Sequence, residues 1–304
     1  EETCGQHHRE EGVRIMTDQA QNLRTLMQLN NSSTRVITVA SGKGGVGKSS
    51  LALNLGIALS RQGRRPLIID TDFGFSNIDV MLGVHPQHDL LDVIEGRCTV
   101  REAIETGFAG VQFISGGSGV YELLRMSSSQ LIQVMGYLAK LEDVADTIIF
   151  DTGAGLSEHA VWLNRAAHET ILVITPEPTS MVDAYALLKM LRDQGEKPHV
   201  SLVVNKVSGV REAQAVAQGF TRIAEKNLSV RIHSLGHVTQ DMNMSNAIKK
   251  QVPILISYPR CTAAVDICTL AQRYLGQPPK VVKRPGVTGF LEYFLARKSA
   301  VRES

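Results

Sequence analysis

The sequence predicts an α/β fold with a doubly wound, mainly parallel sheet. Short apolar runs rich in Val, Ile and Leu alternate with longer amphipathic segments, as strands and helices do in this fold class. Two of the runs, residues 66–70 and 147–151, end in an aspartate, and a glycine-rich turn joins the first run to the first long helix. At 304 residues, the chain is long enough for one large domain with an extension at each end.

The first strand and the first helix flank the glycine-rich turn. Residues 36–40 form an apolar, largely β-branched run of strand length. From Lys48 onward, Leu51, Leu55 and Leu59 recur on one face of a helix. The turn therefore lies between the end of a buried strand and the beginning of a helix.

The glycine turn has the spacing of a phosphate-binding loop. Four residues separate Gly42 from Gly47, and Lys48 and Ser49 follow. Glycines let the backbone N–H groups approach an anion, and the helix N-terminus adds the positive end of its dipole. We expect Lys48 to reach the β- and γ-phosphates and the Ser49 hydroxyl to hold Mg²⁺. The predicted nucleotide contacts are Gly44, Gly45, Val46, Gly47, Lys48, Ser49 and Ser50.

A second lysine, Lys43, stands at the front of the loop. The string from Lys43 to Ser49 resembles the deviant phosphate loop of the MinD/ParA ATPases. The resemblance implies a P-loop ATPase that hydrolyses ATP with Mg²⁺ and forms an ATP-dependent homodimer. It also implies that Lys43 reaches across that dimer to the partner's nucleotide, a role that the spacing alone does not show.

Acidic residues follow two of the predicted strands. Asp70 ends the run at residues 66–70 and Asp72 stands two residues later, while Asp151 ends the run at residues 147–151. Because the carboxyl ends of parallel strands meet at one edge of the sheet, all three are well placed for a ligand. The resemblance assigns Asp72 to the attacking water and Asp70 to the magnesium environment, while the pattern around Asp151 is typical of a carboxylate that holds Mg²⁺ through water. The expected catalytic residues are Lys43, Lys48 and Asp72, and the expected metal residues are Ser49, Asp70 and Asp151.

Two residues are candidates for the base side of the site. Asn205 follows a strand at residues 200–205 and fits an adenine contact, although a β-turn asparagine is a serious alternative. By resemblance to the same family, Asp241 at the end of the segment 235–241 is the second base-side contact. Thr239 stands where relatives often carry a proline, so the sequence departs from the family pattern at this contact.

The N-terminal extension, residues 1–34, contains a short amphipathic helix after a polar start. By pattern alone, this helix packs on the domain. Its sequence from Asp18 to Arg24 resembles the DQAxxLR motif of FlhG-type flagellar-number regulators, called FleN or YlxH in some lineages. The resemblance implies that the segment activates the GTPase FlhF through Asp18, Gln19, Ala20, Leu23 and Arg24.

The C-terminal extension, residues 277–304, combines a Pro/Gly linker with an apolar stripe. Residues 276–304 carry six Lys or Arg and two Glu, a net charge of +4, which leaves −2 for the rest of the chain. The stripe is the family's amphipathic membrane-targeting helix by resemblance, and core packing is the alternative. The expected contacts with an anionic membrane surface are Phe290, Leu291, Phe294 and Leu295.

Composition excludes several classes of protein. No apolar run reaches 18 residues, and the start does not resemble a signal peptide, so we expect a cytoplasmic protein, peripheral on the inner face of the membrane when ATP-bound. The overall net charge of +2 gives no argument for nucleic acid, and we expect no direct DNA binding. An iron–sulfur carrier of related fold needs paired cysteines, and this chain has none among Cys4, Cys98, Cys261 and Cys268.

These observations predict a dimerising switch ATPase, with its MinD-like domain at residues 35–276. The resemblance implies that it regulates flagellar number and placement together with the FlhF-type GTPase and flagellar C-ring proteins. The alternatives are a MinD-like division-site ATPase, which should lack the segment at residues 18–24, and a ParA-like partition ATPase.

Overall fold

The computed structural model describes residues 34–72, 77–116, 136–193, 198–276, 286–287 and 289–291. The chain divides between Ser33 and Thr34, and every described residue belongs to the second unit. In the described part of the chain, no helix is long and apolar enough to cross a membrane. Some predicted contact residues lie outside the described residues: Asp18, Gln19, Ala20, Leu23, Arg24, Phe294 and Leu295.

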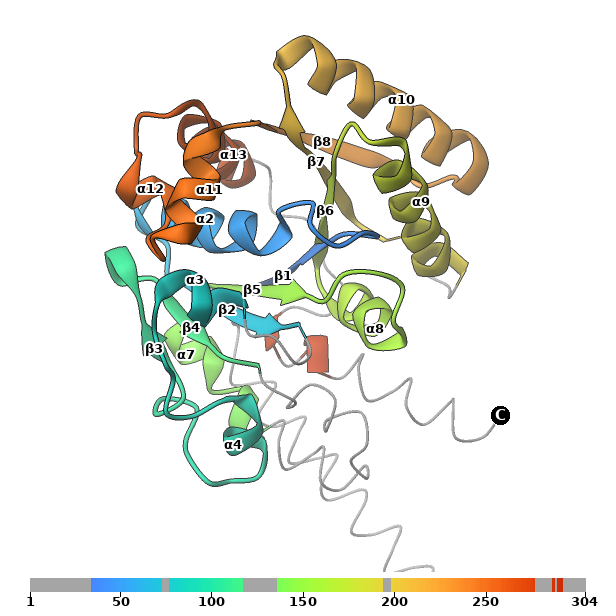
Figure 1. Ribbon diagram of the computed structural model, residues 1–304. Helices are drawn as coiled ribbons and strands as arrows, with labels where there is room; N and C mark the ends of the chain where they lie inside the picture. The colour runs from blue at the N-terminus through green and yellow to red at the C-terminus, as the bar shows by residue number, and fades with distance from the viewer. Residues whose placement is uncertain are drawn as a thin grey trace, which may run out of the picture. The chain divides into compact units, whose positions relative to one another are not determined.

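The described strands form one eight-stranded sheet in the order β3-β4-β2-β5-β1-β6-β7-β8 (Figure 1). Neighbouring strands are parallel, except that β3 is antiparallel to β4. Strand β1 lies between β5 and β6, so the loop after it opens near the middle of the carboxyl edge. The predicted fold class is confirmed. The strands are β1 (Arg35–Ala40), β2 (Pro66–Thr71), β3 (Glu105–Thr106), β4 (Gln112–Ile114), β5 (Thr147–Thr152), β6 (Glu169–Ile174), β7 (Val200–Val207) and β8 (Ile232–Thr239).

Helices cover both faces of the sheet. On one face, α2 and α13 pack over alternate apolar residues such as Ile37 and Ile149. On the other face, α9 and α10 pack over the intervening residues of β6 and β7, such as Leu172 and Leu202. The helices are α2 (Lys48–Ser60), α3 (Asn77–Leu82), α4 (Leu90–Ile94), α7 (Leu141–Val144), α8 (Glu158–Ala166), α9 (Pro178–Asp193), α10 (Val210–Leu228), α11 (Met242–Lys249), α12 (Ile254–Ser257) and α13 (Thr262–Gly276), with a 3₁₀ turn η1 (Phe108–Gly110).

Helix α2 is more deeply buried than its predicted apolar face requires. Leu51, Leu55 and Leu59 are buried as expected, but Leu53 and Ile57 on the other sides of the helix are buried too. The cause is that α2 packs against both the sheet and α13. A helix covered on several sides has little freedom to move, and this fixes the loop that precedes it.

The described beginning of the C-terminal stripe is part of the core. Val287, Phe290 and Leu291 are buried, and the Phe290 ring stacks on Phe150 of β5 with 5.0 Å between the centroids. The Val287 N–H donates a hydrogen bond to the Glu142 carboxylate at 2.6 Å. An exposed membrane-binding face was expected of Phe290 and Leu291, but here the core-packing alternative holds for both. They fill the apolar space that α7 and α8 leave over β2 and β5.

Candidate active site

The loop after β1 has the backbone of a phosphate cradle. Gly45 and Gly47 have φ angles of 76° and 90°, a left-handed conformation that residues with side chains rarely adopt. A Cβ on Gly47 would also overlap the side-chain amide of Asn205. The loop therefore requires glycine at both positions, and the backbone N–H groups before α2 remain open to an anion.

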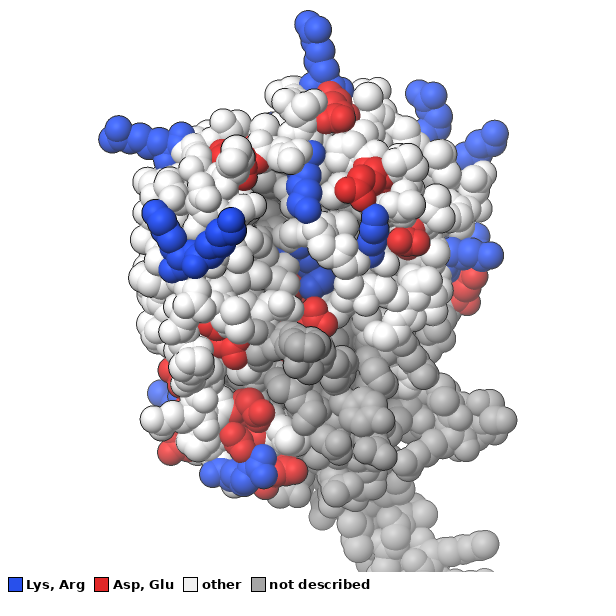
Figure 2. Space-filling view, in the orientation of Figure 1, with Lys and Arg blue, Asp and Glu red and all other residues white. Residues whose placement is uncertain are grey.

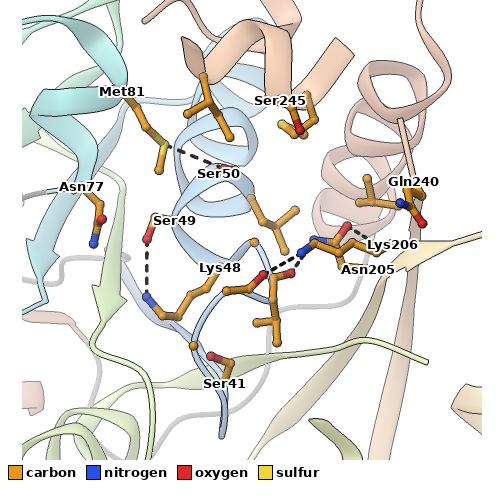
Figure 3. A pocket seen from close by; sticks show the side chains of 18 of the residues that line it. Ser41, Lys48, Ser49, Ser50, Asn77, Met81, Asn205, Lys206, Gln240 and Ser245 are labelled. Carbon is orange, nitrogen blue, oxygen red and sulfur yellow. Dashed lines mark hydrogen bonds between the residues drawn. The ribbon is translucent and has the colours of Figure 1, made fainter. Parts of the chain in front are cut away.

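A cavity of about 550 Å³ lies over this loop, a size typical of small-molecule sites. It is bounded by the loop, the first turn of α2, the segment that follows β2, the carboxyl-terminal ends of β7 and β8, and α11 (Figure 3). Asp70 and Asp151 do not line it. The predicted site residues that do are Lys43, Gly44, Gly45, Val46, Gly47, Lys48, Ser49, Ser50, Asp72, Asn205 and Asp241.

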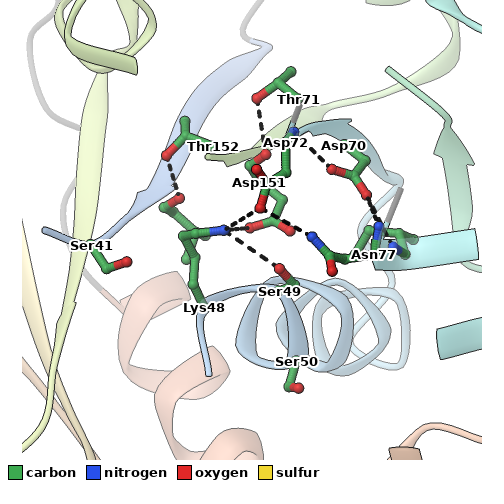
Figure 4. A network of polar contacts seen from close by, with 12 residues as sticks. Ser41, Lys48, Ser49, Ser50, Asp70, Thr71, Asp72, Asn77, Asp151 and Thr152 are labelled. Atoms are coloured by element: carbon green, nitrogen blue, oxygen red, sulfur yellow. Dashed lines mark hydrogen bonds and ion pairs between the residues drawn. The ribbon is translucent and has the colours of Figure 1, made fainter. Parts of the chain in front are cut away.

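The Lys48 ammonium lies between two carboxylates (Figure 4). Its Nζ is 3.0 Å from Asp151 Oδ1 and 3.9 Å from Asp72 Oδ2. Lys48 is 6 % exposed and Asp151 is fully buried, so each charge compensates the cost of burying the other. The lysine expected at the phosphates is thus held by Asp151 of β5 and by Asp72, which follows β2.

Asp151 keeps one unused oxygen beside Lys48. Its Oδ2 is buried and has no hydrogen-bond partner in the described part of the chain. Burial raises the pKa of Asp151, and the Lys48 charge opposes that rise. A buried carboxylate oxygen without a donor fits the hydration shell of a bound cation.

Mg²⁺ fits this site only together with phosphate oxygens. Within the described residues, no group of three or more His, Cys, Asp or Glu side chains could hold a metal ion. Mg²⁺ normally keeps several waters and takes one or two protein ligands plus substrate phosphates. The Ser49 hydroxyl and the free oxygen of Asp151 match that smaller requirement, with Asp151 acting through water.

Asp70 pins both ends of the loop that follows β2. Its carboxylate accepts hydrogen bonds from the N–H groups of Asp72 at 3.0 Å, Asn77 at 2.7 Å and Ile78 at 3.0 Å. Burial, followed by the charge of Asp151, raises the pKa of Asp70 to about 6. Since its oxygens bind the backbone and do not line the cavity, any part in the magnesium environment is indirect.

Asn77 holds the carboxylate of Asp72. The Asn77 Nδ2 donates to Asp72 Oδ2 at 3.1 Å, on the side that faces Lys48. The sequence analysis did not single out Asn77. Its position at the first residue of α3, directly after the loop that begins at Asp72, is the signal that could have identified it.

Lys43 contacts the beginning of α9. Its Nζ lies 2.8 Å from Glu177 Oε2 and 2.9 Å from Thr179 Oγ1, and the lysine side chain is 38 % exposed. The hydrogen bond and the charge of Lys43 lower the pKa of Glu177. Glu177 and Thr179 were also missed, because a contact between residues so far apart in the chain leaves no local pattern.

The front of the phosphate loop also touches the α9 backbone. A Cβ on Gly42 would overlap the carbonyl of Asp183 and the N–H of Ala184. Only glycine lets the loop approach the helix this closely. The loop is thus packed between α2 behind it and α9 in front of it.

Asn205 and Lys206 bind the loop from the other side (Figure 3). The Asn205 Nδ2 donates to the Val46 carbonyl at 2.7 Å, and Lys206 Nζ donates to the Gly45 carbonyl at 2.7 Å. The Asn205 Oδ1 accepts from the Lys206 N–H at 2.9 Å. Asn205 lines the cavity as predicted, and one N–H of its amide also holds the loop.

Asp241 caps two helices. One carboxylate oxygen accepts from the Asn243 N–H at 2.9 Å in the first turn of α11, and the other accepts from the Ala263 N–H at 3.3 Å at the beginning of α13. Asp241 also lines the cavity. Its carboxylate thus fixes the beginnings of α11 and α13 at the edge of the cavity.

Comparison with known proteins agrees with this geometry. The model of the CobQ/CobB/MinD/ParA nucleotide binding domain matches residues 37–254. The antiactivator FleN of Pseudomonas aeruginosa is 34% identical over 263 residues, which cover 86% of this chain and 92% of FleN. The flagellum site-determining protein YlxH of Helicobacter pylori is 30% identical over 249 residues, covering 78% of this chain and 83% of YlxH.

A solved structure extends the comparison to the fold. The cell division ATPase MinD of Pyrococcus furiosus superposes with a TM-score of 0.63 at 27% identity, covering 79% of this chain and 98% of MinD. The residues that the family model matches include the phosphate loop and the acids beside Lys48. This chain therefore belongs to the CobQ/CobB/MinD/ParA nucleotide-binding family, as an ATP- and Mg²⁺-dependent ATPase of the FlhG/FleN (YlxH) type.

Proposed function

We propose that this ATPase regulates flagellar number and placement as a switch that dimerises with ATP and separates after hydrolysis. The observation that carries the proposal is the position of Lys43. Its ammonium is bound by Glu177 and Thr179 at the surface, while the Lys48 ammonium forms an ion pair with Asp151 in the same subunit. A lysine at the partly exposed front of the loop, away from the acids that hold Lys48, can turn to the nucleotide of a second subunit.

Each described residue of the site has a separate role in hydrolysis. Residues 44–50 would hold the phosphates and Ser49 the Mg²⁺, and the bound ion would neutralise charge on the γ-phosphoryl group as it transfers. Lys48 supplies the fixed positive charge. Asp72 orients the attacking water and accepts its proton, Asn77 keeps the Asp72 carboxylate in place, and Asp70 fixes the loop that carries both.

The flagellar part of the proposal is supported by the relatives. FleN is named as an antiactivator and YlxH as a flagellum site-determining protein. By this likeness, the partners are an FlhF-type GTPase, engaged through residues 18–24, and proteins of the flagellar C-ring. On the face shown in Figure 2, Lys and Arg side chains are scattered among Asp and Glu, which favours protein partners over DNA for that face.

Membrane attachment requires the tail to leave the core. Val287, Phe290 and Leu291 are buried against β5 and its neighbours, so a lipid surface cannot reach them in this state. We place the cytoplasmic protein at the inner face of the membrane only when the ATP dimer has released both tails. Two weak helices then bind together with a gain in avidity.

Flagellar counts test the proposal directly. Electron microscopy of the native host should show an altered number or position of flagella when the gene carries Lys48→Ala or Asp72→Ala, with cell division and chromosome partition unchanged. Copurification with FlhF-type and C-ring proteins should depend on ATP. Normal flagella together with misplaced septa or lost plasmids would support the division-site or partition alternative instead.

A further inference from the structure

Helices α3 and α11 both contribute side chains to the cavity. Asn77 and Met81 line it from α3, and Met244 and Ser245 line it from α11. In Figure 3, Met81 and Ser245 lie on either side of Ser50, in the first turn of α2. The two helices are far apart in the chain, so the shape of the site depends on how one is held relative to the other.

Helix α11 ends in an unusual residue. Gln251 has a φ angle of 54°, and its N–H donates to the Ile248 carbonyl at 3.0 Å, while the next N–H, that of Val252, donates to the Ala247 carbonyl at 3.1 Å. Glycine is the common residue at this position of a helix end, because a side chain strains the left-handed backbone. Helix α3 follows that rule, since it ends at Gly83 with a φ angle of 64°. A glutamine at the same position of α11 indicates that its side chain has a role that offsets the strain.

The Gln251 side chain joins the ends of the two helices. Its Nε2 donates a hydrogen bond to the Val80 carbonyl, in the last turn of α3, at 2.9 Å. A Cβ on Gly83 would lie 3.3 Å from the Gln251 Oε1 and 3.4 Å from its Cβ, so the glutamine rests on the bare backbone of that glycine. The end of α11 therefore holds the end of α3.

The other end of α3 holds the carboxylate assigned to the attacking water. The Asn77 Nδ2 donates to Asp72 Oδ2 at 3.1 Å, and the Asn77 N–H donates to Asp70 at 2.7 Å. Helix α3 has only six residues, and a helix this short is not stable by itself. Its position depends on its two buried side chains and on the contacts at its ends, of which Gln251 provides one.

We propose that Gln251 is a positioning residue for ATP hydrolysis. By fixing the end of α3 against α11, it keeps Asn77 in place, and through Asn77 it keeps the Asp72 carboxylate aimed at the attacking water. This inference rests on the role proposed above for Asp72. Gln251 lies outside the residues that line the cavity, so it acts on the hydrolysis step and not on nucleotide binding.

Gln251→Gly tests the proposal without damaging the helix end. The kcat for ATP hydrolysis should fall by about fivefold, the effect of one lost hydrogen bond, while the Kd for a fluorescent ATP analogue stays within about twofold. The thermal midpoint should change little, because relief of the left-handed strain offsets the lost bond. Gln251→Lys keeps a donor of similar reach, and its kcat should stay within about twofold of the unchanged protein.

Ser229→Gly is the matched control. Ser229 has a φ angle of 55° at the end of α10 and lies outside the cavity, so this variant makes the same backbone change elsewhere and should keep its kcat. An unchanged kcat in Gln251→Gly would overturn the proposal. So would an equal fall in Ser229→Gly, or a loss of ATP affinity as large as the loss of rate.

A double-mutant cycle tests the route through Asn77. In an Asn77→Ala background, Gln251→Gly should lower kcat by less than about twofold, because the side chain that it positions is already gone. The full fivefold fall in that background would refute the route. Asp72→Ala is measured beside these variants: hydrolysis at the normal rate in Asp72→Ala would refute the role proposed for Asp72 itself. Slow hydrolysis in Asp72→Ala with a normal rate in Gln251→Gly would refute only the inference about Gln251.

Discussion

The Lys43 ammonium and the Glu177 carboxylate form an ion pair of 2.8 Å between the phosphate loop and the first turn of α9. This pair must break before Lys43 can reach a second subunit. Glu177→Gln should therefore lower the ATP concentration needed for half-maximal dimerisation, by a few fold at most because exposed ion pairs contribute little. Light scattering across an ATP titration measures the shift. Glu225→Gln on α10 is the control, and a higher requirement for ATP in Glu177→Gln would refute the idea that this contact restrains Lys43.

Lys48 and Asp72 should fail in different ways. Lys48→Ala removes the charge that binds the phosphates and leaves the buried Asp151 uncompensated, so ATP binding and thermal stability should both fall. Asp72 is partly exposed, so Asp72→Ala should bind ATP, hydrolyse it at a small fraction of the normal rate and accumulate dimer. Nucleotide binding, light scattering and a melting curve separate the two. An Asp72→Ala protein that stays monomeric with ATP would contradict its assigned role.

Asp70 should make stability depend on pH. Its pKa of about 6 in the folded state lies above the ordinary 3.8, so the folded protein binds this proton more tightly than the unfolded chain does. The resulting stabilisation is present at low pH and is lost as pH rises through about 6. Between pH 4.5 and pH 7.5, the free energy of unfolding should fall by about 2 kcal/mol relative to the same change in Asp70→Asn. Urea unfolding at the two pH values is the measurement, and parallel behaviour of the two proteins would exclude the effect.

In the ATP-free protein, Phe290 should contribute to the stability of the fold and not to membrane binding. Phe290→Ala removes the ring stacked on Phe150 and should cost about 3–5 kcal/mol of stability in the ATP-free protein. It should also make the tail more sensitive to protease. Phe108→Ala is the control, because Phe108 is an exposed phenylalanine. A variant as stable as this control would show that the tail does not depend on the core.

The N-terminal segment should be separable from the ATPase. Deletion of residues 1–28 removes the motif at residues 18–24 but none of the contacts described around the cavity. ATP-driven dimerisation should therefore persist, while stimulation of the partner GTPase is lost. Gln19→Ala and Arg24→Ala in the full chain test the two candidate polar contacts. Full stimulation by the truncated protein would reduce the motif to a packing helix.

The fold was predictable because its signals are local. Apolar runs, the glycine spacing before Lys48 and the acids at the ends of two strands each occupy a few consecutive residues, and parallel topology brings them to one edge. Glu177 escaped because its contact with Lys43 joins residues far apart in the chain, and no local pattern records such a partner. Asn77 lies close to Asp72 in sequence, but only the structure shows that its amide meets the Asp72 carboxylate.

The base side and the tail show a different limit. Asp241 was predicted as a base-side contact from the family resemblance, but the sequence does not reveal that its oxygens also bind the beginnings of two helices. Likewise, the spacing of Val287, Phe290 and Leu291 predicts an apolar stripe without naming what covers it. The uncovered surface over β5, which only the assembled sheet defines, decides that they are buried.

The absence of a side chain at Gly42 has a mechanical consequence. With the loop backbone resting directly on Asp183 and Ala184, there is no slack between the phosphate end of the site and the middle of α9. If a docking subunit displaces α9, the loop moves with the helix, because no side chain lies between the two backbones to rearrange. Even the methyl group of an alanine at position 42 would push the phosphate loop away from α9. The residue at this position therefore determines the distance between the loop and the helix.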